Sequence, residues 1–295
     1  MQYRIIHTTN YNYFQKVSLC HNVARLLLRD TDHQLVKSCT IDIQPLPEIL
    51  NQYNDFLGNK VLYFAIQREH QELKVKIISE VVTMDKEFVQ PIDISWEAML
   101  DPSAAVSKLP LEIKQYILQT PLTMAYDVIC DYAKKSFKSG KGFYECSKDL
   151  MQRIYDDFEF SSGFTTVSTP LQEVMKTRKG VCQDFAHLAI ACIRSIGLPV
   201  RYVSGYIETL PPPGEEKLFG VDASHAWYSI YLPNQGWYDF DPTNNIIPAN
   251  QHLCLGWGRD YADISPLKGV IFSSGTHQLQ VSVDVRRISS SHSAF

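Results

Sequence analysis

The stretch Lys179-Gly180-Val181-Cys182-Gln183-Asp184-Phe185-Ala186-His187 decides the fold prediction, because it places a cysteine at the start of an amphipathic helix. Apolar residues recur at three- and four-residue spacing up to Ile196, which predicts a helix over 182–196. Gly180 lets the chain turn sharply before the helix, and Gly197 and Pro199 end it. A helix N-terminus stabilises a thiolate through its unpaired N–H groups and its dipole. Cys182 is therefore a candidate nucleophile.

A histidine and a carboxylate follow on a predicted β-hairpin. Strands are expected over 225–232 and 237–241, separated by the turn Pro233-Asn234-Gln235-Gly236. A loop of three or five residues places Asp241 opposite Trp227 and diagonal to His225 on the same sheet face. A loop of two or four residues would place His225 and Asp241 on opposite faces. A triad of Cys182, His225 and Asp241 thus predicts the register of this hairpin.

These motifs, in this order, resemble those of the transglutaminase-like cysteine enzymes of bacteria. The resemblance rests on Gly-Val-Cys-Gln-Asp-Phe-Ala-His, on Ser-His-Ala-Trp at 224–227, and on Gly-Trp-Tyr-Asp-Phe-Asp-Pro-Thr-Asn at 236–244. It extends to segments 3–9 and 54–59, which look like the small β domain that precedes such cores, and to 258–263. It implies an α+β fold with a papain-like core, in which the nucleophile helix packs on a mostly antiparallel sheet. It also implies that Cys182 is the nucleophile, His225 the general base and acid, and Asp241 the residue that orients the imidazole.

Two other side chains compete for these roles. His187 lies five residues beyond Cys182, so a helix rotates it away from the face of the cysteine. We interpret it as a packing histidine or a hydrogen-bond partner behind the site. Asp239 lies two residues before Asp241 on the same strand face, and only the family resemblance favours Asp241 over it.

The periodicity along the chain divides it into two units and a connector. Residues 1–84 alternate short β-type runs with turns and predict a β-sandwich-like domain, 85–109 form a proline-containing connector, and 110–295 form the catalytic core. Within the core we expect helices and strands at these positions: helices over 110–119, 122–137 and 144–157, a short helix from Pro170 capped by Thr169, and strands near 200–207, 225–232, 237–241, 270–272 and 279–285.

These residues indicate acyl transfer at an amide bond. The Cys182 thiolate would attack the carbonyl to give a thioester, and His225 would protonate the departing amine. The backbone N–H of Cys182 is the expected first oxyanion donor. We expect a peptide or isopeptide hydrolase acting on a protein or peptide substrate. The alternatives are a protein-glutamine transglutaminase, which transfers the acyl group to an amine, and a transglutaminase-fold binding module without turnover.

Three further segments have a functional and a structural interpretation each. Residues 158–166 would line the cleft or belong to the core, and the proline-rich excursion 208–217 would gate the cleft or form a solvated hairpin tip. Arg259, Asp260 and Asp263 would recognise substrate or form a local ion-pair network, and the network is the stronger interpretation. No phosphate loop, HExxH pattern or EF-hand loop is present in the sequence, so we expect no cofactor and no metal.

Composition limits the remaining possibilities. A hydrophobic content of 45% and a charged content of 20% indicate a globular protein, and a net charge of −4 without a basic run argues against nucleic acid as a partner. No apolar run approaches the roughly 20 residues that span a bilayer, and the N-terminus lacks signal-peptide features, so a cytoplasmic location without membrane association is expected. The seven cysteines show no Cys-x-x-Cys pair, which argues against a disulfide framework or a zinc site. The sequence carries no signal of oligomeric state.

Overall fold

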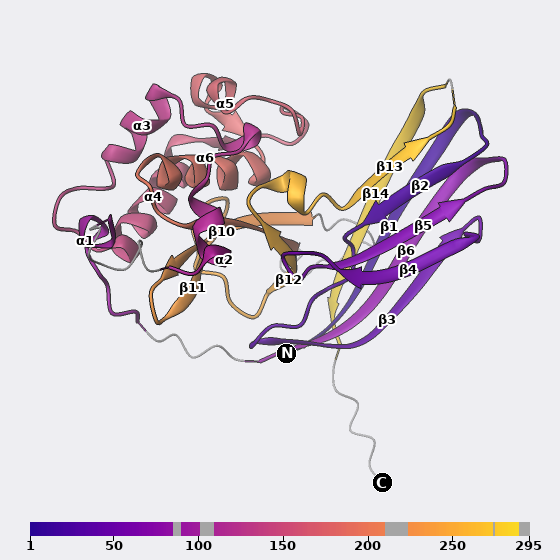
Figure 1. Ribbon diagram of the computed structural model, residues 1–295, viewed down its shortest axis with the longest axis horizontal. Helices are drawn as coiled ribbons and strands as arrows, with labels where there is room; N and C mark the ends of the chain where they lie inside the picture. Colours follow the sequence, from indigo (N-terminus) through magenta and orange to yellow (C-terminus); the bar gives the residue numbers. More distant parts are fainter. Residues whose placement is uncertain (85–89, 101–108, 210–223, 274, 289–295) are drawn as a thin grey trace, which may run out of the picture.

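Two structural units lie side by side in the computed structural model, a β sandwich and a helical core built around its own sheet (Figure 1). The structure describes residues 1–84, 90–100, 109–209, 224–273 and 275–288. The proline-rich excursion 208–217 therefore lies largely outside the described residues, and so does most of the predicted connector 85–109. Within the described residues, no helix is both long and apolar enough to cross a membrane.

The sandwich consists of two four-stranded antiparallel sheets, ordered β14-β1-β6-β3 and β13-β2-β5-β4. Period-2 alternation of buried and exposed residues along β1 and β6 gives one sheet its inward face. Side chains such as Val75 and Phe64, one from each sheet, meet in a shared apolar core. Its first six strands are β1 (Gln2–Val17), β2 (Cys20–Ala24), β3 (Gln34–Gln44), β4 (Ile49–Asn54), β5 (Lys60–Ile66) and β6 (His70–Thr83).

The last two strands of the chain belong to this sandwich, which corrects the assignment of all of 110–295 to the core. β13 (Leu267–Ile271) pairs with β2, and β14 (His277–Arg287) pairs with β1 along eleven residue pairs. Figure 1 shows these yellow strands beside the indigo and purple ones. Alternation predicted both strands near these positions, but it contains no information about the sheet they join. Each of them adds an edge to a sheet whose apolar face is already formed.

The core places one helix, α6 (Cys182–Ser195), against a four-stranded antiparallel sheet of order β11-β10-β9-β12. Leu188, Ala189 and Ile193 are fully buried in the contact between α6, the sheet and the surrounding helices. The helix matches the predicted range 182–196 to within one residue. The remaining elements of the core sheet and its longer helices are α3 (Asp127–Lys134), α4 (Phe143–Asp157), α5 (Leu171–Thr177), β9 (Val200–Ile207), β10 (Ser224–Leu232), β11 (Gly236–Phe240) and β12 (His252–Gly258).

The helical predictions before α6 hold less closely. Residues 110–119 form only α2 (Leu111–Lys114) and a 3₁₀ turn, and 122–137 contain a 3₁₀ turn followed by α3. Thr169 does not cap α5, because its hydroxyl accepts a hydrogen bond from the Thr166 backbone N–H at 2.9 Å. A short α1 (Trp96–Leu100) precedes the core within the region predicted as connector.

The β10–β11 hairpin has the register that the triad requires. Tyr228 pairs with Phe240 and Leu232 with Gly236, so three residues form the loop. Asn234 and Gly236 both have positive φ, which is typical of such a turn. An odd loop places His225 and Asp241 on the same face of the sheet, as predicted.

Side-chain amides of the sandwich hold the free edge of β12, the outermost strand of the core sheet. The Gln34 amide donates to the Cys254 carbonyl and accepts from the Cys254 N–H, both at 2.8 Å. Asn59 does the same at Trp257, at 2.8 and 3.0 Å. Both amides thus stand where a further strand would be, and they satisfy backbone groups that lie in a buried contact.

We predict that Asn59→Ala lowers the free energy of unfolding by about 3 kcal/mol, because it removes the fully buried amide that bonds both the N–H and the C=O of Trp257. Urea unfolding followed by circular dichroism measures this change. The matched control Asn51→Ala, on the exposed strand β4, should change the free energy by less than about 0.5 kcal/mol. Equal stability of the two variants would contradict the role of Asn59.

Candidate active site

Cys182 is the first residue of α6 and follows the extended residue Val181. Its thiol is half-buried, and Sγ lies 4.0 Å from the backbone carbonyl oxygen of Ser224. A Cβ added at Gly180 would lie 2.9 Å from the Asp184 carboxylate, so the turn before Cys182 requires glycine. The helix start and the start of β10 therefore meet at the sulfur.

Asp184 stabilises the start of this helix through hydrogen bonds. Its buried carboxylate accepts hydrogen bonds from the Val181 N–H at 2.8 Å and from the Thr165 hydroxyl at 2.6 Å. Burial raises the pKa of Asp184, while these two hydrogen bonds oppose the rise. Thr165 belongs to the segment 158–166, which thus lies beside the start of α6.

His225 lies next to Cys182 at the start of β10 and is buried. Its Nε2 is 2.7 Å from Oδ2 of Asp241, which leaves Nδ1 as the ring nitrogen that does not serve the carboxylate. Burial lowers the pKa of His225, but the hydrogen bonds and charges of Asp241 and Cys182 outweigh it and raise the pKa to about 10. The imidazole is therefore protonated at neutral pH and faces both the carboxylate and the sulfur.

Asp241 is fully buried and accepts hydrogen bonds from five nitrogen atoms. Oδ1 accepts from the backbone N–H groups of Thr243 and Asn244, at 3.0 and 3.3 Å. Oδ2 accepts from His225 at 2.7 Å, from His252 at 3.0 Å and from the Asn244 side-chain amide at 2.8 Å. Burial raises the pKa of Asp241, and the hydrogen bonds from the two histidines more than reverse that effect, so the carboxylate is ionised.

His252 is a site residue that our sequence reasoning missed. It is the first residue of β12, and Trp227 packs edge-on against its ring at a centroid distance of 5.2 Å. Its Nδ1 is buried and has no hydrogen-bond partner among the described residues, so Nε2 is the nitrogen that bonds the carboxylate. No local pattern marks His252, because β12 reaches the site by pairing with β9 and not through a hairpin.

His225, Asp241 and His252 also form a set of three groups that could hold a metal ion, since one ligand atom from each lies within 4.8 Å of the others. Two imidazoles and a carboxylate are typical zinc ligands. Here both Nε2 atoms lie at hydrogen-bond distance from the same carboxylate oxygen. This geometry fits two ring N–H groups that donate to Asp241. The expectation of no cofactor and no metal stays a prediction.

The two competing side chains lie away from the sulfur, and His187 has a hydrogen-bond partner of its own. His187 is buried behind α6, where Nε2 accepts a hydrogen bond from the Tyr261 N–H at 3.1 Å. Burial, with a smaller effect of Arg194, lowers the pKa of His187 to about 3. Asp239 lies on β11 opposite Ser229, two residues before Asp241 and farther than Asp241 from His225 in the hairpin register.

The charged cluster of Arg259, Asp260 and Asp263 forms a local network of hydrogen bonds and an ion pair. Arg259 pairs with both oxygens of Asp263, at 2.8 and 2.9 Å, and the Asp260 side chain accepts from the Ala262 N–H at 2.7 Å. These bonds fix the 3₁₀ turn after β12, so they support the structural interpretation of the cluster.

Comparisons with known proteins match the whole described architecture. A family model described as the transglutaminase-like superfamily matches residues 131–242, and one described as the bacterial transglutaminase-like N-terminal region matches residues 3–82. An uncharacterised protein of Mycobacterium tuberculosis is 36% identical over 297 residues, which cover 96% of this chain and 92% of the relative. A protein-glutamine gamma-glutamyltransferase of Pseudomonas aeruginosa is 37% identical over 73 residues, 24% of this chain and 11% of that protein.

A solved structure from Cytophaga hutchinsonii, described as a "putative cysteine protease", shares the fold. It superposes with a TM-score of 0.76 at 21% identity, and the match covers 98% of this chain and 92% of that one. The fold of this chain therefore recurs in that protein.

We predict that the His225 ring keeps its proton at pH 8 and loses it near pH 10. Because this pKa lies above the value of about 6.5 for an unfolded chain, His225 contributes stability fully below pH 6.5, and that contribution is lost as pH rises towards 10. Imidazole ¹⁵N NMR measures the titration. Asp241→Asn should move the midpoint down by more than one pH unit, and an unchanged midpoint would show that Asp241 does not hold the proton.

Proposed function

The chain belongs to the transglutaminase-like superfamily, and from this premise we propose that it is a cysteine-dependent acyl-transfer enzyme acting on amide bonds. The observation that carries the proposal is the position of His225. One side of its ring bonds a buried carboxylate at 2.7 Å, and the residue before it lies against the sulfur of Cys182. This arrangement supports Cys182 as the nucleophile, His225 as the base and Asp241 as the orienting acid.

The proposed reaction begins with the thiol proton on His225 and the sulfur of Cys182 as nucleophile. Sulfur attacks the amide carbonyl, the C–N bond breaks, and His225 gives its proton to the leaving amine. The backbone N–H of Cys182, which has no acceptor within the helix, donates to the oxyanion and supplies about 3 kcal/mol of transition-state stabilisation. Asp241 keeps the imidazole in the tautomer that presents Nδ1 to the sulfur.

The thioester is then resolved by water or by an amine. In hydrolysis, His225 takes a proton from water, the oxygen attacks the thioester carbonyl, and the S–C bond breaks to release the acid. We propose this route, with a peptide or isopeptide as substrate. Transfer to an amine is the second candidate, and the local similarity to a protein-glutamine gamma-glutamyltransferase supports it.

We predict that a peptide library incubated with the protein yields products that require Cys182. Mass spectrometry separates the routes, because hydrolysis adds water across the cleaved bond, whereas transfer attaches a supplied primary amine with loss of ammonia. Cys182→Ala should abolish both products. Products that persist in Cys182→Ala would contradict the proposal, and amine adducts without cleavage would favour the transferase.

The binding-module alternative has its own test in the alkylation of cysteines. Iodoacetamide at pH 6, followed by peptide mapping, should label Cys182 at least about tenfold faster than Cys39, although Cys39 is exposed and Cys182 only half-buried. Cys39 therefore serves as an internal reference in the same chain. Equal rates at the two cysteines would favour a module without turnover.

We further propose that His252 positions Asp241, and we predict that removing its N–H donor lowers kcat. His252→Phe keeps a ring against Trp227 but donates no hydrogen bond to Oδ2, so kcat should fall about tenfold while KM stays the same. His252→Gln offers an amide N–H and should recover part of the loss. An equal loss of kcat in both variants, together with a lower melting temperature, would show that His252 serves only in packing.

A further inference from the structure

Arg201 is a buried cation on β9, at the end of the core sheet remote from Cys182. Its guanidinium carbon lies 4.2 Å from the ring centre of Trp237 and 3.9 Å from that of Trp257, and the residue is 8% exposed. The two indole rings contact the guanidinium through cation–π attraction. They leave its five N–H donors, which lie at the edge of the plane, without a hydrogen-bond acceptor among the residues that the structure describes.

A second buried arginine of the core shows what a purely structural guanidinium looks like here. Arg194 on α6 is 3% exposed and donates from three nitrogens at 2.6–3.0 Å. By contrast, Arg201 makes no side-chain hydrogen bond or ion pair to any described residue, and its Nε is buried without a partner. Burial lowers the pKa of Arg201 to about 10, while Asp239 opposes that change, so the side chain is a cation at neutral pH.

A cavity of about 340 Å³ adjoins this free cation. Besides Arg201 and the two indoles, its walls include Phe56 from the sandwich and Glu112 from α2. The volume is at the small end of the range for ligand sites and matches a single amino-acid-sized group. Aromatic walls around one unsatisfied guanidinium favour a ligand with an apolar body and one anionic group.

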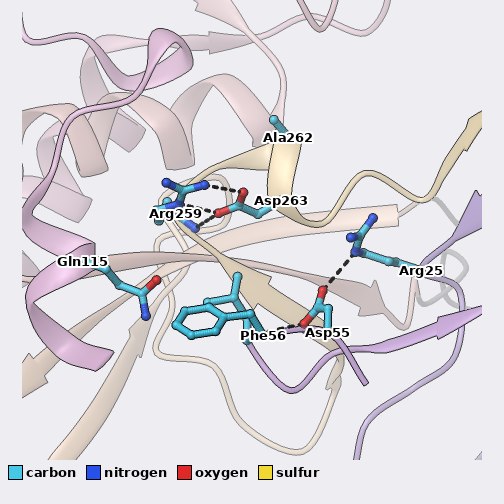
Figure 2. Close-up of a pocket in the computed structure, with 8 residues that line it drawn as sticks. Arg25, Asp55, Phe56, Gln115, Arg259, Ala262 and Asp263 are labelled. Carbon is cyan, nitrogen blue, oxygen red and sulfur yellow. Dashed lines mark hydrogen bonds and ion pairs between the residues drawn. The ribbon is translucent and has the colours of Figure 1, made fainter. Parts of the chain in front are cut away.

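The two arginines that line the neighbouring cavity are each paired with a carboxylate. This second cavity, of about 370 Å³, shares Phe56 with the first and is lined by residues from both units (Figure 2). There the Arg25 guanidinium pairs with Asp55 at 3.2 Å, and Arg259 pairs with Asp263, as the dashed lines in Figure 2 mark. Neither pair has a charge left for a ligand, so Arg201 stands apart from both.

We propose that the cavity at Arg201 binds a carboxylate carried by an aromatic or other apolar group, with the guanidinium as a bidentate donor. The planar fork of arginine matches a carboxylate in geometry. The Glu112 carboxylate in the same wall disfavours a multiply charged anion such as phosphate. Arg201 lies four residues before Gly205, the cross-strand partner of His225, which is about 13 Å along a strand. The site is thus separate from the reacting sulfur, and the proposal stands whether or not the chain is an enzyme.

The test uses the full chain with Cys182→Ala, so that no turnover occurs. Isothermal titration with N-acetyl-phenylalanine should show saturable binding, and the matched N-acetyl-phenylalanine amide should bind at least about tenfold more weakly. Acetyl-Phe-Glu amide and acetyl-Phe-Gln amide form a second pair, which distinguishes a side-chain carboxylate from a chain terminus. Equal affinity of acid and amide in both pairs would overturn the proposal, as would inorganic phosphate binding more tightly than either acid.

Variants then assign the binding to this cavity. Arg201→Lys keeps the charge but loses the fork, and Phe56→Ala removes a ring that is 84% exposed, so it should not impair folding. Both variants should bind N-acetyl-phenylalanine at least about threefold more weakly. The melting temperature of Phe56→Ala should be unchanged. Arg194→Lys is unsuitable as a control because its bonds are structural, whereas Arg25→Gln, in the neighbouring cavity, should leave the affinity unchanged. Undiminished affinity in both Arg201→Lys and Phe56→Ala would contradict the site.

Discussion

The buried carboxylate of Asp241 is the interaction on which the site depends. A fully buried anion is stable only when hydrogen-bond donors surround it, and Asp241 has five of them. They come from the turn that follows β11, from His225 on β10 and from His252 on β12. One charge therefore ties together three strands of the core sheet, and in the proposed reaction the proton that it holds on His225 is the one that the leaving amine receives.

The same strand that carries His252 connects the site to the sandwich. Two residues after His252, the Gln34 amide forms hydrogen bonds with both the N–H and the C=O of Cys254. The Asn59 amide does the same with Trp257. The edge of the core sheet is thus formed partly by side chains of the other unit. The sandwich in turn is completed by β13 and β14, which the chain adds after the core. The two units are consequently interdependent, although each has its own apolar core.

Sequence reasoning succeeded where the signal is local. The apolar spacing from Phe185 to Ile196 defined α6, and the turn at 233–236 limited the β10–β11 hairpin to two classes of register, of which the triad selects the observed one. It failed where contacts join distant segments. His252 reaches Asp241 only because β12 adds to β9, and the pairing of β14 with β1 depends on which sheet has a free edge. The sequence near His252 or β14 indicates neither of these contacts. The role of Asn244 was hidden for a different reason, since a turn amide becomes informative only once the buried carboxylate beside it is known.

Formation of a thioester on Cys182 is the central claim of this account. Mixing the protein with a peptide identified as a substrate, quenching with acid within the first turnovers and measuring the intact mass tests it directly. The account predicts an acyl adduct on the peptide that contains Cys182, released by hydroxylamine and absent from Cys182→Ala. Turnover without any acyl adduct in the wild-type chain, or an adduct that maps to another residue, would contradict it.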